Sequence, residues 1–135
     1  MKPLVRFFLF IILFTMSYTG IAQKETFGVV SYNLPKGWQQ QQSEAGIQLS
    51  VTDKKTGGYA LAMIAKPIPS TATANENFDS FWETLVKKSV NVNAAPQMAA
   101  PEEGNGWTIL SGSANYTDVA STGLATLLTA TANGQ

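Results

Sequence analysis

The sequence predicts an α+β fold, an antiparallel sheet of about five to six strands packed on one central amphipathic helix. Two observations predict it. Residues 73–92 repeat apolar side chains at helical spacing, whereas several other stretches alternate apolar with polar residues, as half-buried strands do. A lone helix of this length is marginal in water, so its apolar stripe requires a partner surface, which the strands would form.

The predicted helix has one apolar side and one charged side. The apolar stripe follows the i, i+3, i+4, i+7, i+8 pattern and comprises Phe78, Phe81, Trp82, Leu85 and Val86. On the charged side the acids Asp79 and Glu83 precede Lys87, the order that the helix dipole favours. The stripe is therefore predicted to face the core of the fold rather than a groove in a partner.

Both ends of this helix carry boundary signals. Thr73 and Glu76 have the spacing of a capping box, in which each side chain bonds the other residue's backbone N–H. Asn75 is a rival N-cap. At the other end, Asn93 and Pro96 mark where the helix has stopped.

Residues 1–22 have the organisation of a secretory signal peptide. A positive region, an apolar run and two small residues follow one another: Lys2 and Arg6, residues 8–14, Gly20 and Ala22. The sequence predicts cleavage before Gln23 and export to the periplasm or the extracellular space. An uncleaved signal is the alternative, and it would be the only link to a membrane. Residues 23–135 are predicted to form a single α+β domain.

The composition excludes several kinds of chemistry. The 135 residues include no Cys and no His, and 9 basic residues balance 9 acidic ones. Without Cys and His there is no Ser-His-Asp or Cys-His nucleophile and no ordinary zinc site. An exported chain without Cys has no disulfide scaffold, so its core must stabilise it. The balanced charge gives no argument for nucleic acid as a partner.

Before the helix, the sequence alternates between strand and turn signals. Residues 27–34 alternate as one strand that ends in a Pro-Lys-Gly-Trp turn. Residues 39–42, four glutamines, are predicted to be an exposed strand edge or a loop. Residues 47–52 and 59–63 alternate as two strands, and residues 53–58 between them have the composition of a hairpin loop.

After the helix, a second set of strands is predicted. Residues 97–99 are a candidate short strand, and residues 101–106 have the composition of a turn. Residues 107–116 alternate as a strand, and residues 124–131 form another. The turn between these two strands falls at residues 118–123.

The last predicted strand carries apolar side chains towards both faces, namely Leu124, Leu127 and Leu128. Asn133-Gly134 follows it, the strongest two-residue hairpin signal. A hairpin turn implies a return strand. The sequence therefore predicts that the domain is incomplete and lacks its last strand and a C-terminal helix. The alternative is that the strand at 124–131 is itself an unprotected edge.

Two segments resemble a known family. Residues 32–38 (YNLPKGW) and 78–86 (FDSFWETLV), in this order with their strands, are similar to the PsbP-like α/β/α sandwich family, which includes exported bacterial proteins of the DcrB type. The resemblance covers about 27–135 and implies a further strand and a C-terminal helix on the other face of the sheet. It also implies a mostly non-enzymatic role in binding or assembly, because the shared motifs are structural ones.

No residue is assigned a catalytic, cofactor-binding or metal-ligating role. Glu76, Asp79 and Glu83 on the helix could hold Ca²⁺. Glu102-Glu103 in a glycine-flanked loop could do the same. A solvated charged surface is the preferred interpretation of both groups, since the sequence contains no calcium-loop pattern.

Three classes of function stay open. The preferred one is an exported, non-enzymatic binding or assembly module of the bacterial cell envelope, whose partner is an unknown protein or small molecule. A small-ligand-binding envelope stress protein, with a pocket between helix and sheet, is an alternative. Trp38 and Trp107 are interpreted as core or sheet-cover residues rather than as a ligand platform. A hydrolase that uses carboxylates alone is the least favoured, because its acids would have to face each other across a cleft.

Overall fold

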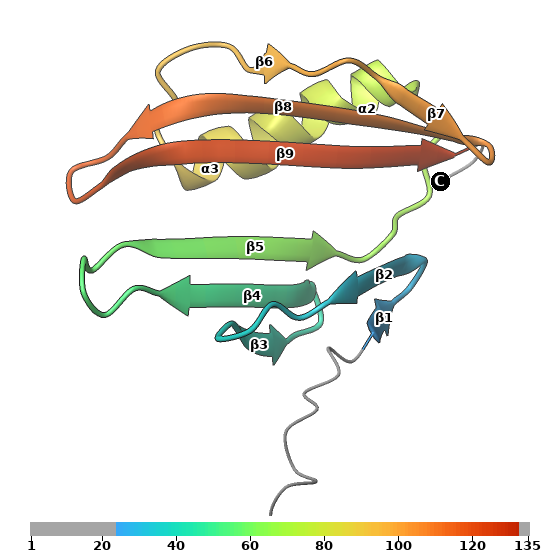
Figure 1. Cartoon of the computed structure of the whole chain (residues 1–135). Helices are drawn as coiled ribbons and strands as arrows, with labels where there is room; N and C mark the ends of the chain where they lie inside the picture. Colours follow the sequence, from blue (N-terminus) through green and yellow to red (C-terminus); the bar gives the residue numbers. More distant parts are fainter. Residues whose placement is uncertain (1–23, 133–135) are drawn as a thin grey trace, which may run out of the picture. The chain divides into compact units, whose positions relative to one another are not determined.

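The computed structural model describes residues 24–132, and these form two compact units, 24–67 and 68–132 (Figure 1). Together they contain nine strands in three separate antiparallel sheets and one helical segment. The predicted α+β class is confirmed in this coarse form. The prediction of one sheet of five to six strands on a central helix is wrong. Alternation reveals which residues form strands, but not which strands share a sheet.

The first unit begins with a hairpin of β1 (Lys24–Phe27) and β2 (Val30–Asn33). The sequence predicted one continuous strand over 27–34, and this prediction is wrong. Gly28 takes a φ of 58°, in the left-handed region that glycine tolerates best, and the chain reverses there. The alternation continues through the reversal, which is why the pattern concealed it.

A three-stranded sheet completes the first unit in the order β3 (Gln39–Gln42), β4 (Gly46–Thr52), β5 (Tyr59–Ala65). The predicted strands at 47–52 and 59–63 are confirmed, and the four glutamines form an exposed edge strand. The central strand β4 holds the two buried side chains of the sheet, Ile47 and Leu49.

The loop between β4 and β5 is the hairpin loop that the sequence predicted. The Asp53 N–H donates to the Gly58 carbonyl at 2.7 Å. The Asp53 carboxylate accepts hydrogen bonds from the Lys55 N–H at 2.9 Å and the Thr56 hydroxyl at 2.8 Å. These bonds, the Lys55 N–H first, lower the pKa of Asp53, because they favour its ionised form.

The second unit contains a four-stranded sheet built around β8 (Trp107–Thr117). β9 (Thr122–Ala132) pairs with the whole length of β8. The short strands β6 (Gln97–Met98) and β7 (Glu102–Gly104) pair with the other edge of β8. The predicted strands over 97–99, 107–116 and 124–131 are confirmed. The turn predicted at 101–106 is shorter than expected, because β7 takes up its first half.

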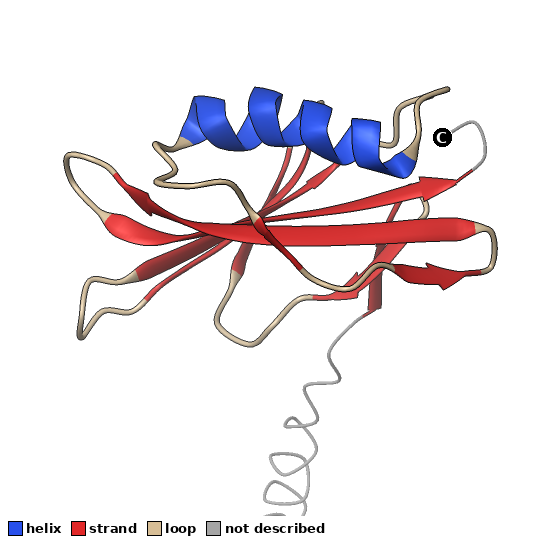
Figure 2. Ribbon diagram, turned by 90° about the horizontal axis from the view of Figure 1, so that it is seen from above, coloured by secondary structure: helices blue, strands red, loops and turns tan. Residues whose placement is uncertain are grey.

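One helical segment crosses one face of the β8–β9 pair (Figure 2). It consists of α2 (Ala74–Phe81), a π-helical turn η1 (Trp82–Val86) and α3 (Lys87–Ser89). Thr73 is its N-cap, as predicted, and the capping box with Glu76 is present. The helix ends at Ser89, three residues earlier than the predicted stretch, and Val92 bridges to Tyr116 instead.

The core of the second unit lies between this helix and the sheet. Phe78 and Trp82 stack at a centroid separation of 5.9 Å and pack against Leu110 and Ala114 of β8. Gly112 lies under the Phe78 ring, where a Cβ atom would come within 2.8 Å of the ring. A glycine at this position allows the aromatic pair to lie close to the strand.

The predicted apolar stripe is confirmed at its N-terminal end and wrong at Leu85, whose side chain is 44% exposed. The π-helical turn explains the difference. Its i→i+5 bond, from the Lys87 N–H to the Trp82 carbonyl, makes the turn wider than an α-helical one. In this wider turn, Val86, four residues after Trp82, nearly completes a turn and faces the core. Leu85, three residues after Trp82, falls short of a full turn and lies outside the core.

Candidate functional site

Of the three carboxylates that the sequence offered as a calcium site on the helix, Glu76 and Glu83 have other partners, and Asp79 is exposed. Glu76 is bound in the capping box, where its Oε2 accepts the Thr73 N–H at 2.8 Å and the Thr73 hydroxyl at 2.9 Å. These bonds, the backbone one first, lower the pKa of Glu76. Its carboxylate is thus already used in stabilising the start of the helix.

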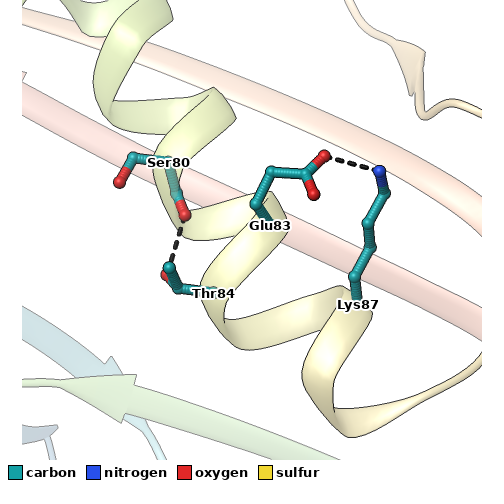
Figure 3. A network of polar contacts seen from close by, with 4 residues as sticks. All are labelled: Ser80, Glu83, Thr84 and Lys87. Carbon is teal, nitrogen blue, oxygen red and sulfur yellow. Dashed lines mark hydrogen bonds and ion pairs between the residues drawn. The ribbon is translucent and has the colours of Figure 1, made fainter.

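Glu83 points along the helix surface to Lys87, as Figure 3 shows. The two side chains form an i, i+4 ion pair, and both are well exposed. The neighbouring Thr84 hydroxyl donates to the Ser80 carbonyl at 2.7 Å. Among residues 24–132, no three acidic side chains gather in a way that could hold a metal ion.

The second acidic pair, Glu102 and Glu103, lies in strand β7 rather than in a loop. Neighbouring residues of a strand project to opposite faces of the sheet, so these two carboxylates diverge. Both are exposed. The glycine-flanked reversal follows them, at Asn105 and Gly106, which both take positive φ. The glycine-flanked segment around Glu102 and Glu103 is therefore a strand that enters a tight turn, and it does not bring the two carboxylates together.

The tryptophans fall into two groups. Trp82 is buried in the helix–sheet core, at 3% exposure. Trp38 and Trp107 are half-buried and belong to different units, 24–67 and 68–132. Each of these two tryptophans is a partly covered side chain of its own unit.

A small polar hollow lies where the helix begins, and sequence reasoning missed it. It has a volume of about 230 Å³, and its lining includes five hydroxyl-bearing residues: Ser70, Thr71, Thr73, Thr108 and Thr131. These residues come from the segment before α2 and from β8 and β9. The threonines of β8 and β9 face each other in the observed register, a pairing that single-strand alternation does not reveal.

Two of these hydroxyls are connected through Asn77 of the helix. The Ser70 hydroxyl donates to the Asn77 side-chain carbonyl at 2.7 Å, and the Asn77 amide donates to the Thr131 hydroxyl at 3.3 Å. This bridge fixes the helix start against β9 and leaves the hollow with an ordered polar wall. Such a wall could accept a small hydroxylated ligand by hydrogen bonding.

Two polar atoms of the second unit are buried without a protein hydrogen-bond partner, the Trp82 Nε1 and the Thr129 Oγ1. Thr129 lies on the helix-facing side of β9, two residues before Thr131, and is 8% exposed. A buried hydroxyl without a partner lowers stability. The sequence alternation could have placed Thr129 on the core side, together with Leu127, but could not show that it lacks a partner.

Strand β5 carries an exposed apolar stripe on one face of its sheet. Tyr59, Leu61 and Met63 are 62%, 57% and 55% exposed. Their cross-strand neighbours in β4 are polar, for example Ser50 opposite Leu61 and Gln48 opposite Met63. The other face of the same sheet holds the buried Ile47 and Leu49, so the exposed apolar stripe is confined to β5 on the opposite face.

Strand β9 repeats this arrangement in the second unit. Leu127 packs against the helix core, whereas Leu124 and Leu128 project from the other face and are 65% and 63% exposed. The sequence predicted apolar side chains on both faces of this strand, and that prediction is confirmed. The Asn133-Gly134 turn lies outside the described residues, as does the signal segment 1–22.

Comparisons with protein-family models, curated proteins and solved structures find no match for this chain. Among the described residues, no helix has the length and the apolar character needed to cross a membrane. The function has therefore to be inferred from the surfaces described above.

Proposed function

We propose that the chain is an exported, non-enzymatic binding or assembly module of the bacterial cell envelope. The observation that carries this proposal is the exposure of large apolar side chains on two edge strands. Tyr59, Leu61 and Met63 line β5, and Leu124 and Leu128 line β9. Grouped apolar side chains on a protein surface commonly mark an interaction site.

The distribution of reactive groups supports a role without chemistry. The sequence contains neither His nor Cys. Glu76 is used in the helix cap, Glu83 is paired with Lys87, and the neighbours Glu102 and Glu103 diverge along a strand. These groups do not form the paired carboxylates across a cleft that a glycoside hydrolase needs.

The resemblance to the PsbP-like family supports the same proposal. In the described part, an aromatic helix covers one face of an antiparallel sheet, as the resemblance implies for residues 78–86. Membership of that family, including its DcrB-type exported proteins, belongs to the proposal. A shared fold does not by itself assign a role, so the surface carries the argument.

Site-directed photo-cross-linking tests the proposal in the exporting bacterium. A cross-linking amino acid at Leu61, in the apolar stripe of β5, is expected to form a protein adduct with a partner or a second copy. The matched control places the same amino acid at Lys36, an exposed polar position of the same unit. The same amino acid at Leu128 tests β9. If neither Leu61 nor Leu128 gives an adduct, the result contradicts a binding or assembly role.

A small-ligand-binding envelope protein is the second candidate, and the polar hollow favours it. A ligand that binds the native state raises the melting temperature. A thermal-shift screen of small sugars and other hydroxylated compounds is expected to show a rise that Thr108→Val removes and Thr84→Val, an exposed position away from the hollow, preserves. No shift with any compound would leave the hollow without a role in binding.

A further inference from the structure

We propose that β9 pairs with β9 of a second copy of this chain, antiparallel and centred on Thr126. Within the described residues, the backbone of β9 is hydrogen-bonded to β8 alone, so no strand pairs with its other edge there. An open edge strand is a template for another strand. The inference rests on the proposed function, because it names the second copy as the partner in assembly.

The charge distribution favours β9 over β5 for pairing between copies. Residues 119–135 carry no charged side chain, and Asp118 lies near one end of β9 only, so pairing about Thr126 brings no like charges together. β5 lies between Lys54-Lys55 and Lys66. Antiparallel pairing of β5 with itself would place Lys66 beside the lysines at the hairpin end of the copy, and like charges at that position oppose the contact.

The pattern of apolar and polar side chains in β9 is nearly symmetrical about Thr126. In the proposed register, Leu124 lies opposite the copy's Leu128, and Thr126 lies opposite its own counterpart. Leu124, Thr126 and Leu128 all project from the face away from the helix, and all three are exposed. Pairing therefore forms two contacts between exposed leucines of the two copies, one on each side of the central Thr126 pair.

The helices leave room for this pairing. Each helix packs over both β8 and β9, on Leu110 and Ala114 of one strand and Leu127 of the other. With neighbouring strands about 4.8 Å apart, two helices centred over their own β8–β9 pairs would lie about 10 Å apart, two half-spacings plus one β9–β9 spacing. Packed helices lie about 8–10 Å apart, so the helices of the two copies fit side by side without collision.

Cysteine cross-linking tests the register directly, because the chain has no Cys of its own. In Thr126→Cys, the two cysteines face each other with Cα atoms about 4.5–5.5 Å apart, within disulfide range. Mild oxidation of the full chain, its intact mass recorded first, is expected to give a covalent dimer. Leu124→Cys alone is expected to form no disulfide between copies, whereas a mixture of Leu124→Cys and Leu128→Cys chains is expected to cross-link.

Sedimentation measurements on the unoxidised chain complete the test. We expect a monomer–dimer equilibrium that Leu128→Glu weakens by at least about tenfold. Val29→Glu, at a similarly exposed position of the first unit outside the apolar stripe of β5, is expected to leave it unchanged. Circular dichroism verifies that each variant is folded, and the Leu124/Leu128 mixture replaces Thr126→Cys if that variant unfolds.

The possible outcomes separate this inference from the proposed function. A monomer at every concentration, or a dimer that cross-links through Ala62→Cys at the centre of β5 and not through Thr126→Cys, overturns the pairing of β9. Adducts from Leu61 in the cell would still support the proposed function. A β9 dimer of a chain that is retained in the cytoplasm would contradict the proposed function and support the pairing.

Discussion

Trp82 is a central side chain of the helix–sheet core. It is 3% exposed, stacks on Phe78 and belongs to the buried cluster with Leu110 and Ala114. We expect Trp82→Ala to lower the free energy of unfolding by about 3–5 kcal/mol, since it leaves a large cavity. Asp79→Ala, on the exposed side of the helix, should change it by less than about 0.5 kcal/mol. Urea unfolding measures both, and equal effects would contradict the placement of the helix.

The two threonines on the helix-facing side of β9 are expected to respond in opposite directions to the same substitution. Thr129 buries a hydroxyl without a partner, whereas the Thr131 hydroxyl accepts a hydrogen bond from Asn77 at 3.3 Å. Thr129→Val removes the unpaired group and keeps the shape, so stability should rise by about 1 kcal/mol. Thr131→Val should lower it by a similar amount, about 1 kcal/mol.

Thermal and urea unfolding of the two valine variants provide a matched pair, since both positions lie on one strand and one face. A loss of stability in Thr129→Val would show that the hydroxyl has a hydrogen-bond partner, such as a bound water. The result therefore also reports whether the core of the second unit is dry.

At the scale of elements, the capping box should make stability depend on pH. The carboxyl of Glu76 has a lowered pKa in the folded chain, because the Thr73 N–H and hydroxyl bond its ionised form. A lowered folded pKa adds stability above the unfolded value, about 4.3 for Glu, and that stability is lost as the pH falls through the folded value.

We therefore expect Thr73→Ala to destabilise the chain by about 1 kcal/mol at neutral pH, through loss of the cap. The difference from the unaltered chain should shrink as the pH falls below about 4. Unfolding of both chains across this range measures the effect. A difference that stays constant down to the lowest pH would show that the ionised form of Glu76 contributes nothing to the cap.

Most of the elements could be predicted from the sequence, and their boundaries and assembly less well. The capping box at Thr73 and the strands around Leu49 and Leu110 follow from local patterns that one segment contains in full. The reversal at Gly28 and the π-helical turn after Phe81 do not, since neither interrupts the apolar spacing. The division into three sheets depends on pairing between distant segments, which periodicity does not record.

The candidate site was less predictable than the fold. The sequence correctly placed apolar side chains on both faces of β9, because alternation assigns Leu127 and Leu128 to opposite sides. It did not reveal the polar hollow, since Thr108 and Thr131 meet only through the register of β8 and β9. Local patterns thus identify which side chains are available, and pairing determines which of them act together.

At the scale of the whole molecule, the prediction concerns export. Lys2 and Arg6, the apolar run at 8–14 and the small residues Gly20 and Ala22 form the signal pattern. These residues lie outside the described part, so the prediction rests on the sequence alone. Cleavage would remove two positive charges and leave a chain with more acidic than basic residues, which could not rely on positive charge to stay at an anionic membrane.

We expect the product recovered from the periplasm or the medium to begin at Gln23, as N-terminal sequencing and the intact mass would show. Ala22→Tyr, which places a bulky side chain where a small one is required, should leave the chain uncleaved in the membrane fraction. Ala45→Tyr serves as a control for a bulky residue elsewhere. A chain that retains Met1 in the membrane fraction without any substitution would contradict export by a cleaved signal.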